Sequence, residues 1–402
     1  MSALTTCHHN MSEHNMVPCT QTAGGDQAQG WSVNDILRQF GPAYLEKFQD
    51  RMSLHQIKTL KALSQCRTPA AGSVVFRCTQ CAKLHQVPKS CGNRHCPTCQ
   101  GAKAKDWLQE QQARLLPCAY FMITFTVPAE FRPFTRSHPR ECYKAIFEAA
   151  NQSLVKLARD PKYLGSSKLG MVGVLHTWGR DLSYHPHVHF IVPGGAISKS
   201  GTQWLSSRVD FLVPVLALSK IYRAKYMTLM KRCGLLEKID RVVWTEAWNV
   251  NCQAVGDGRD SLRYLAPYVF RVAIGNHRIK DVVCYEDGTG TVTMMVKPSG
   301  QRRYRKLTVT ADEFIRRFLQ HVLPKGFQKI RHFGFMHKRS KVQPAWLAML
   351  VTVTLNMVYV LIVTPARMPI KRNLCCPDCG GELKCVGFAK TAIQIPEPFD
   401  SS

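Results

Sequence analysis

Two histidines separated by a valine, His187 and His189, open a run of β-branched and apolar residues that ends before Gly194. Such a run predicts a strand, because these side chains fit the surface of a pleated sheet. Side chains alternate between the faces of a strand, so both imidazoles project to one face while Val188 points into the core. Two imidazoles at this spacing either bind one metal ion or simply make that face polar. The segment therefore belongs to a sheet, and its polar face is a candidate metal site.

A third ligand has to come from elsewhere, since two histidines seldom complete such a site. Residues 171–178 predict a preceding strand, and the polar loop after it folds this strand antiparallel to the histidine strand. His176, near the end of that strand, then reaches the same face. His185 is the alternative, but its place on the sheet is not secured. We expect His176 to join His187 and His189.

Two tyrosines four residues apart, Tyr264 and Tyr268, lie in residues 261–273, which predict a helix. On a helix this spacing puts both phenols on one face, about a turn apart. A buried aromatic pair has the same pattern. Pro267 predicts a kink between them, because a proline inside a helix removes a hydrogen bond. The tyrosines are thus either packing residues or a candidate pair for covalent chemistry.

A pair of cysteine knuckles predicts a zinc site. Cys78 and Cys81 are followed, after fourteen residues, by Cys96 and Cys99. This is the spacing of a tetrahedral four-thiolate site, in which each CxxC turn presents two sulfurs to one ion. A closed site leaves no position for water, so we expect a structural, DNA-contacting role. Two surplus ligands inside the loop, Cys91 and His95, could replace one of the four or join His85 in a second site.

One more knuckle lies near the C-terminus. Cys376 and Cys379 have the CxxC spacing, and Cys375 and Cys385 are their only cysteine neighbours in sequence. These four residues do not form the familiar pattern of two paired knuckles. The sequence therefore leaves the ligands of a second zinc ion unspecified.

The charge balance indicates a polyanionic partner. Lys and Arg total 54 against 27 for Asp and Glu, which gives a formal net charge of +27. Nucleic acid is the leading candidate, ahead of anionic lipid or an acidic protein. The densest basic runs are at residues 302–306, 316–317 and 325–331. Tyr304, inside the first run, offers a ring for base stacking.

The cysteine count and an apolar stretch bear on the compartment. Seventeen cysteines are an odd number, and no apolar signal segment opens the chain, so we expect a reducing cytoplasm. Residues 344–365 carry no charge and are long enough to span a bilayer. Thr352, Thr354 and Asn356 interrupt them, and basic residues flank both ends. We expect a buried helix, or a helix plus a strand, and no membrane span.

The ordered motifs resemble those of HUH-type, two-tyrosine transposases of the insertion sequence 91 group, which move by rolling-circle transfer of a single DNA strand. His187-Val188-His189 stands for the HUH motif, and Tyr264 and Tyr268 for the tyrosine pair. The likeness covers the chain from about Trp31 to about Phe388. It includes five further segments, residues 66–70, 93–100, 125–128, 272–279 and 323–327.

The resemblance implies transesterification on single-stranded DNA. A tyrosine oxygen attacks the scissile phosphorus, which leaves a 5'-phosphotyrosine and a free 3'-hydroxyl. The resemblance assigns this chemistry to Tyr264 and Tyr268, and we expect Tyr264 to attack first. A divalent cation on the histidines polarises a phosphate oxygen. Family chemistry implies Mg²⁺ or Mn²⁺, whereas imidazoles alone favour zinc or a softer ion.

The fold class that we expect is α+β, with an antiparallel-sheet HUH nuclease domain preceded by a small helical and zinc-binding domain. Strands are predicted at residues 119–127, 171–178 and 187–192, and helices at residues 31–65, 141–159, 214–232 and 261–273. Four regions follow along the chain: a disordered tail (1–30), a helical and zinc-binding DNA-recognition domain (31–110), the transposase domain (115–335) and an apolar helix with a cysteine knuckle (336–402).

Three functions compete at this stage. The first is a transposase with structural Zn²⁺ that acts on single-stranded transposon ends and target DNA, in the cytoplasm at the nucleoid. The second is a plasmid or phage replication initiator with the same histidines and tyrosines, and the third is a non-catalytic zinc-ribbon regulator. The N-terminal zinc segment and residues 273–279 favour the transposase over the initiator.

Overall fold

The computed structural model describes residues 16–17, 30–179, 181–269, 274–297, 303–357 and 374–390. They form helices and antiparallel sheets, which confirms the expected α+β class. The predicted N-terminal tail lies outside these residues, apart from Gly30 and a two-residue strand, β1 (Met16–Val17).

A five-stranded antiparallel sheet carries the predicted histidine strand. Its strand order is β13-β5-β6-β4-β9. The three strands predicted from the sequence are confirmed as the central three of the sheet. The bounds are β4 (Tyr120–Thr126), β5 (Gly170–Trp178), β6 (Tyr184–Pro193), β9 (Val250–Ala254) and β13 (Ile330–Gly334).

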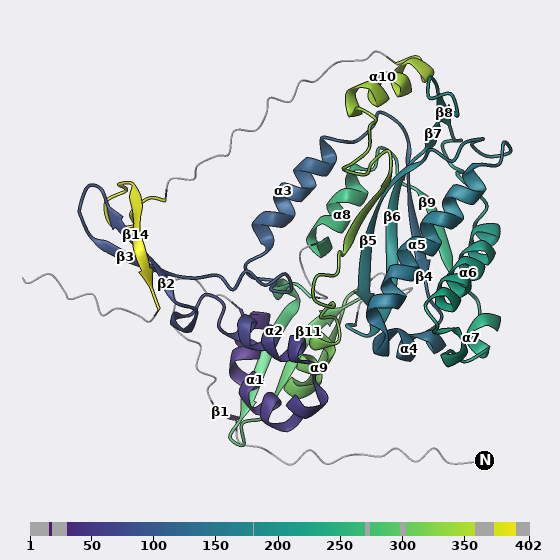
Figure 1. The fold of residues 1–402 in the computed structure, drawn as a ribbon. Helices are drawn as coiled ribbons and strands as arrows, with labels where there is room; N and C mark the ends of the chain where they lie inside the picture. Colours follow the sequence, from purple (N-terminus) through teal and green to yellow (C-terminus); the bar gives the residue numbers. More distant parts are fainter. Residues whose placement is uncertain are drawn as a thin grey trace, which may run out of the picture.

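The two faces of this sheet have different covers. On β4, Phe121, Ile123 and Phe125 are buried against α5 (Pro139–Ala158) and α6 (Val215–Arg232), where the largest apolar core lies. Each such side chain contributes about 1.5–3 kcal/mol by leaving water. The other face carries the histidines. It packs partly against α3 (Gly101–Gln112) and α8 (Arg259–Val269), which lie together on that side (Figure 1).

Shorter elements complete this part of the molecule. The hairpin of β7 and β8 extends from the end of β6, and α10 packs beside it. The remaining bounds are α4 (Arg132–Ser137), β7 (Gly195–Ile197), β8 (Trp204–Ser206), α7 (Val242–Thr245) and α10 (Pro344–Thr354).

A second sheet has the order β1-β10-β11-β12 and packs against two helices from the N-terminal part of the chain and one that follows β12. Its strands are β10 (Ile279–Tyr285), β11 (Gly290–Val296) and β12 (Arg305–Thr310). They share a core with α9 (Ala311–Leu319), α1 (Val33–Phe48) and α2 (Leu54–Ser64).

The predicted helical segment 31–65 is in fact two helices. Ser32 and Asp35 form a capping box at the start of α1, and Ser53 and Gln56 form another at the start of α2. In a capping box, side chains satisfy the free N–H groups of the first turn, so each box starts its own helix.

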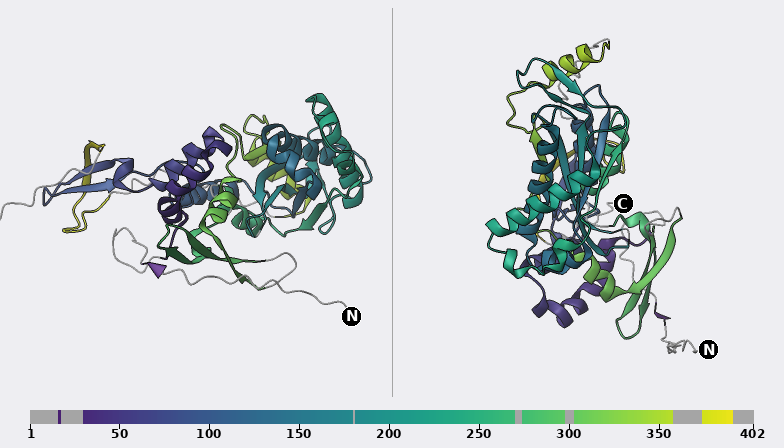
Figure 2. Two further views of the ribbon diagram at one scale, coloured as in Figure 1. Left: turned by 90° about the horizontal axis from the view of Figure 1, so that it is seen from below. Right: turned by 90° about the vertical axis from the view of Figure 1, so that its right-hand side faces the viewer.

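A three-stranded sheet, the ribbon, stands apart from the rest of the molecule (Figure 1; Figure 2, left). It has the order β14-β2-β3, with β2 (Ser73–Cys78), β3 (Leu84–Pro88) and β14 (Leu383–Ala389). All three strands are antiparallel, so a strand from the C-terminal end of the sequence lies against a hairpin from the N-terminal part.

The expected C-terminal region 336–402 therefore has its described parts in two places, with α10 beside β8 and β14 in the ribbon. The apolar stretch 344–365 begins as the predicted helix: α10 buries Leu347 and Val351 and leaves Val353 exposed. Residues 358–365 lie outside the described part of the chain. Among the residues that the structure describes, no helix is both long and apolar enough to cross a bilayer.

Candidate active site and metal centres

Three imidazoles meet on the sheet face that is turned away from α5 and α6. His176 on β5 lies directly opposite His187 on β6, and His189 follows two residues along. Ring centroids are 5.3 Å apart for His176 and His187, 4.6 Å for His176 and His189, and 4.8 Å for His187 and His189. One nitrogen from each ring lies within 4.8 Å of the others. The three side chains can therefore reach one metal ion.

A hydrogen bond leaves the Nε2 atom of His187 for a ligand, and His189 has a polar partner on its Nδ1 side. The Nδ1 of His187 lies 2.6 Å from the carbonyl oxygen of His185, which can only accept, so Nδ1 carries the proton. The Nδ1 of His189 lies 2.8 Å from Oγ1 of Thr124, its cross-strand neighbour on β4. A proton on Nδ1 puts the lone pair on Nε2, which is the usual arrangement in a metal-bound histidine.

Burial makes all three rings neutral at pH 7. It lowers the pKa of His189 to about 4 and holds the pKa values of His176 and His187 well below the usual range. Neutral imidazole is the form that binds metals. His185 shares the strand and lies 5.1 Å from His187 between ring centroids, but it is not part of the group of three. Its contribution is the carbonyl that orients His187.

Two neighbours of the histidines were not predicted from the sequence. Thr124 contacts His189, and its only sequence signal is that it is polar within an alternating apolar strand. The ring of Trp178 stacks on His176, with centroids 4.9 Å apart and planes at 16°. The Nζ of the buried Lys329 lies 4.5 Å from the centroid of that indole. These contacts fix the orientation of the His176 ring.

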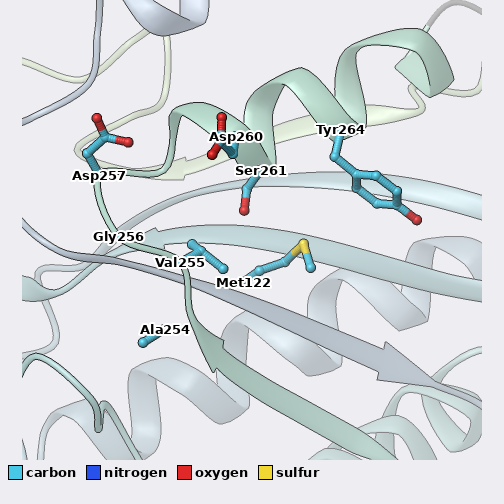
Figure 3. Close-up of a pocket in the computed structure, with 8 residues that line it drawn as sticks. All are labelled: Met122, Ala254, Val255, Gly256, Asp257, Asp260, Ser261 and Tyr264. Carbon is cyan, nitrogen blue, oxygen red and sulfur yellow. The ribbon is translucent and has the colours of Figure 1, made fainter. Parts of the chain in front are cut away.

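Tyr264 lies beside the histidines on α8. The residue is 48% exposed, and its ring meets the ring of His189 edge-on, with centroids 6.3 Å apart. It lines an open pocket of about 560 Å³ together with Met122, Ser261 and, at the far end, Asp257 (Figure 3). Tyr268 follows one turn later on the same helix, which continues through Pro267 to Val269. The side chains of Tyr268 and Pro267 lie outside the described part of the structure.

The predicted zinc ligand set is wrong in its pairing. Cys78 and Cys81 do not meet Cys96 and Cys99; the first pair lies with Cys376 and Cys379, and the second pair with Cys66 and Cys91. The hairpin of β2 and β3 separates them. Cys78 and Cys81 are at its tip, whereas Cys66 and Cys91 flank its base, and six residues of extended strand span about 20 Å.

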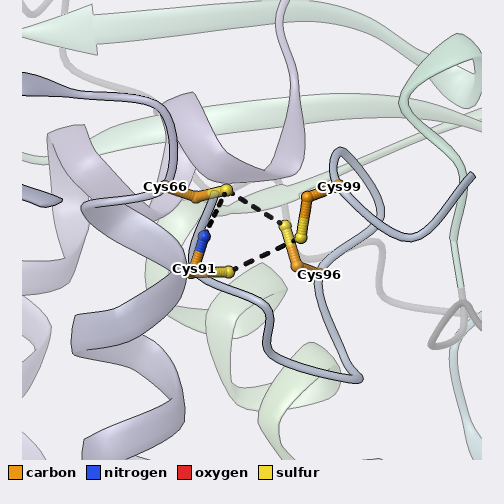
Figure 4. A group of neighbouring side chains, drawn as sticks. All are labelled: Cys66, Cys91, Cys96 and Cys99. Carbon is orange, nitrogen blue, oxygen red and sulfur yellow. Dashed lines mark hydrogen bonds between the residues drawn. The ribbon is translucent and has the colours of Figure 1, made fainter. Parts of the chain in front are cut away.

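The cluster at the base of the hairpin fits a zinc ion (Figure 4). Four sulfurs placed tetrahedrally at 2.3 Å from zinc are about 3.8 Å apart. The Sγ atoms of Cys66 and Cys96 are 3.7 Å apart, and those of Cys91 and Cys99 are 3.8 Å apart. Asn34 on α1 donates from Nδ2 to Sγ of Cys96 at 3.4 Å. Cys91, one of the surplus ligands, thus belongs to this cluster, together with Cys66, which was not predicted as a ligand from the sequence.

His95, a second surplus candidate, has a different partner. Its Nε2 accepts a hydrogen bond of 3.1 Å from the backbone N–H of Leu323. The neighbouring Arg94 donates to the carbonyl of Phe327 at 2.6 Å. The loop that carries Cys96 and Cys99 therefore holds residues 323–327, which lead into β13 of the central sheet.

Comparisons with known proteins find matches for two parts of the chain. Residues 36–127 match the family model "Transposase zinc-binding domain", and residues 170–343 match the model "Putative transposase". The protein "Putative transposase y4qJ" of Sinorhizobium fredii is 35% identical over 333 residues, which is 78% of this chain and 82% of the relative. The chain belongs to the IS91 family of transposases.

A second relative supports the family. The "Transposase for insertion sequence element IS801" of Pseudomonas savastanoi pv. phaseolicola is 25% identical to this transposase over 301 residues, or 71% of each chain. No solved structure matches the chain significantly. As a transposase, the protein acts on DNA, which agrees with its formal net charge of +27. Its zinc-binding domain and cysteine clusters support structural zinc.

Proposed function

We propose that this transposase cuts and rejoins single-stranded DNA by rolling-circle transposition, with Tyr264 as the first nucleophile. One observation carries the proposal: the accessible phenol of Tyr264 lies beside His189, one of three clustered imidazoles. The phenol oxygen forms a bond to the scissile phosphorus while the bond from phosphorus to the 3'-oxygen breaks. The 3'-oxygen leaves as a hydroxyl, and the 5' end stays on the tyrosine.

His176, His187 and His189 are the residues that would hold a divalent cation. Three neutral imidazoles in one cluster, two of them buried, fit such an ion, and the family resemblance favours Mn²⁺ or Mg²⁺. A bound cation supplies a positive charge that polarises a non-bridging phosphate oxygen. The protein itself supplies the orientation, through the His185 carbonyl, Thr124 and Trp178.

Tyr268 is the second nucleophile in this proposal. One helical turn separates its backbone from that of Tyr264, so both residues are on one side of α8. One tyrosine would keep the cut 5' end while the other accepts a second strand. The bond energy of the first phosphodiester is kept for rejoining, which a transposase needs when it joins its element to a new site.

The ribbon is the proposed DNA-recognition surface. Phe388 on β14 is 72% exposed, and the ammonium of Lys89 lies 4.7 Å from the centroid of its ring. An exposed ring beside a cation suits a base that stacks and a phosphate that follows it. The ribbon projects from the molecule, so the ends of a DNA strand can reach this surface (Figure 1).

A cleavage assay tests the proposal. A labelled single-stranded oligonucleotide that carries an end of the element is incubated with protein and Mn²⁺. We expect a covalent adduct that resists denaturant, lost in Tyr264→Phe and kept in Tyr163→Phe, a half-buried tyrosine near Phe211. His187→Ala should bind the strand without cutting it. Tight binding with no adduct in the unaltered protein would instead favour a non-catalytic regulator.

A further inference from the structure

The second cysteine cluster brings together two CxxC pairs that are distant in sequence, Cys78 and Cys81 with Cys376 and Cys379. The Sγ atoms of Cys78 and Cys379 are 3.4 Å apart, and those of Cys81 and Cys376 are 3.7 Å apart. All four sulfurs lie within 4.8 Å of one another. These separations are close to the 3.8 Å or so that a tetrahedral zinc thiolate requires. Both family matches end before the C-terminal pair, at residues 127 and 343.

The two knuckles are also connected through their backbones. The N–H of Thr79 donates to the carbonyl of Glu382 at 2.9 Å, and the N–H groups of Gln80 and Cys81 point at Sγ of Cys78. Gly381 lies so close that a Cβ there would be 3.0 Å from Sγ of Cys78. A Cβ here would push the neighbouring atoms aside by a few tenths of an ångström, so glycine allows the closest approach of the two knuckles. The chain is thus built to place the two pairs together.

His85 could act as a ligand, because its Nε2 is 3.2 Å from Sγ of Cys376 and it forms a separate group with Cys376 and Asp378. However, Asp378 pairs with Lys83 at 3.1 Å. Four thiolates already complete a tetrahedron, which leaves His85 to donate a hydrogen bond to one of them. Such outer hydrogen bonds are usual around metal-bound residues.

We propose that Cys78, Cys81, Cys376 and Cys379 bind a second structural zinc ion, which fastens β14 to the hairpin of β2 and β3. The ribbon has little apolar core to hold it. Within it Val75 and Ala389 are buried, while Phe388 is exposed. Three short strands with so little burial do not hold together unaided, whereas zinc supplies folding free energy directly. The ion therefore decides whether the C-terminal strand is part of the DNA-recognition surface.

Zinc content of the full-length protein, purified without chelator, tests the proposal. We expect two zinc ions per chain in the unaltered protein and one in Cys376→Ser/Cys379→Ser. Cys78→Ser/Cys81→Ser should lose the same ion, so that combining the two pairs removes no more than one. The matched control is Cys375→Ser/Cys385→Ser, which alters the two neighbouring cysteines outside the cluster and should keep both ions. An equal zinc content in the unaltered protein and in Cys376→Ser/Cys379→Ser would overturn the proposal.

A measurement on the unaltered protein covers the case in which these variants fail to fold. A thiol-alkylating reagent, followed by mass spectrometry, should leave Cys376 and Cys379 unmodified until a chelator is added, while the exposed Cys233 reacts at once. Modification of Cys376 and Cys379 before chelation would contradict the zinc site. Neither measurement depends on DNA cleavage, so the result stands apart from the fate of the proposed function.

Discussion

Replacing Thr124 by valine removes a hydroxyl that orients a histidine of the proposed catalytic centre. Valine keeps the shape of threonine but cannot form the hydrogen bond with Nδ1 of His189, now 2.8 Å from Oγ1. Removal of such an outer partner typically costs 10–100-fold in metal affinity, or about 1.4–2.7 kcal/mol. The other two imidazoles keep their own contacts, so we expect the lower end, about tenfold.

The assay is a calorimetric titration with Mn²⁺, paired with cleavage rates over a range of Mn²⁺ concentrations. Thr124→Val should need about tenfold more metal for half-maximal cleavage and recover a near-normal rate at saturation. Thr293→Val is the control, because it removes a hydroxyl that bonds to Thr308 on the exposed part of the other sheet. An unchanged metal affinity in Thr124→Val, or an equal loss in Thr293→Val, would refute the reasoning.

Two further predictions concern DNA binding and acid stability. Phe388→Ala should weaken single-strand binding by about 1–3 kcal/mol with an unchanged salt dependence, because it removes a stacking surface and no charge; an affinity equal to that of the unaltered protein would exclude this role. His321 is buried, and burial lowers its pKa to about 3. Below pH 6.5 this histidine is therefore protonated in the unfolded chain but stays neutral in the folded protein. The free energy of unfolding therefore falls as the pH drops from about 6.5 towards 3. Between pH 7 and pH 5, urea unfolding should show a loss about 2 kcal/mol smaller in His321→Gln than in the unaltered protein, and equal losses would contradict it.

The local pattern was enough to predict the strands around the histidines. Alternation along residues 187–192 placed His187 and His189 on one face, and the hairpin with β5 brought His176 opposite them. The same reasoning passed over Thr124, because its role depends on the register between β4 and β6, which periodicity does not determine. Register follows from pairing partners that are distant in sequence.

The zinc ligands show where sequence spacing misleads. Two CxxC pairs fourteen residues apart normally share an ion, but here a hairpin lies between them and carries one pair to its tip. The partners of Cys78 and Cys81 are about three hundred residues away, with Cys376 and Cys379. The boundary between α1 and α2, by contrast, could have been predicted from the sequence. The capping pattern of Ser53 and Gln56 is visible there and marks the start of α2.

The central claim, that Tyr264 attacks DNA next to the histidine cluster, is tested most directly by locating the covalent bond. The adduct with a single-stranded oligonucleotide is digested with protease and nuclease, and the modified peptide is sequenced by mass spectrometry. The account predicts a nucleotide on Tyr264 in the first cleavage product, absent when His187 is replaced by alanine. A nucleotide attached to a residue outside α8, or an adduct that forms equally well in His187→Ala with chelator present, would contradict it.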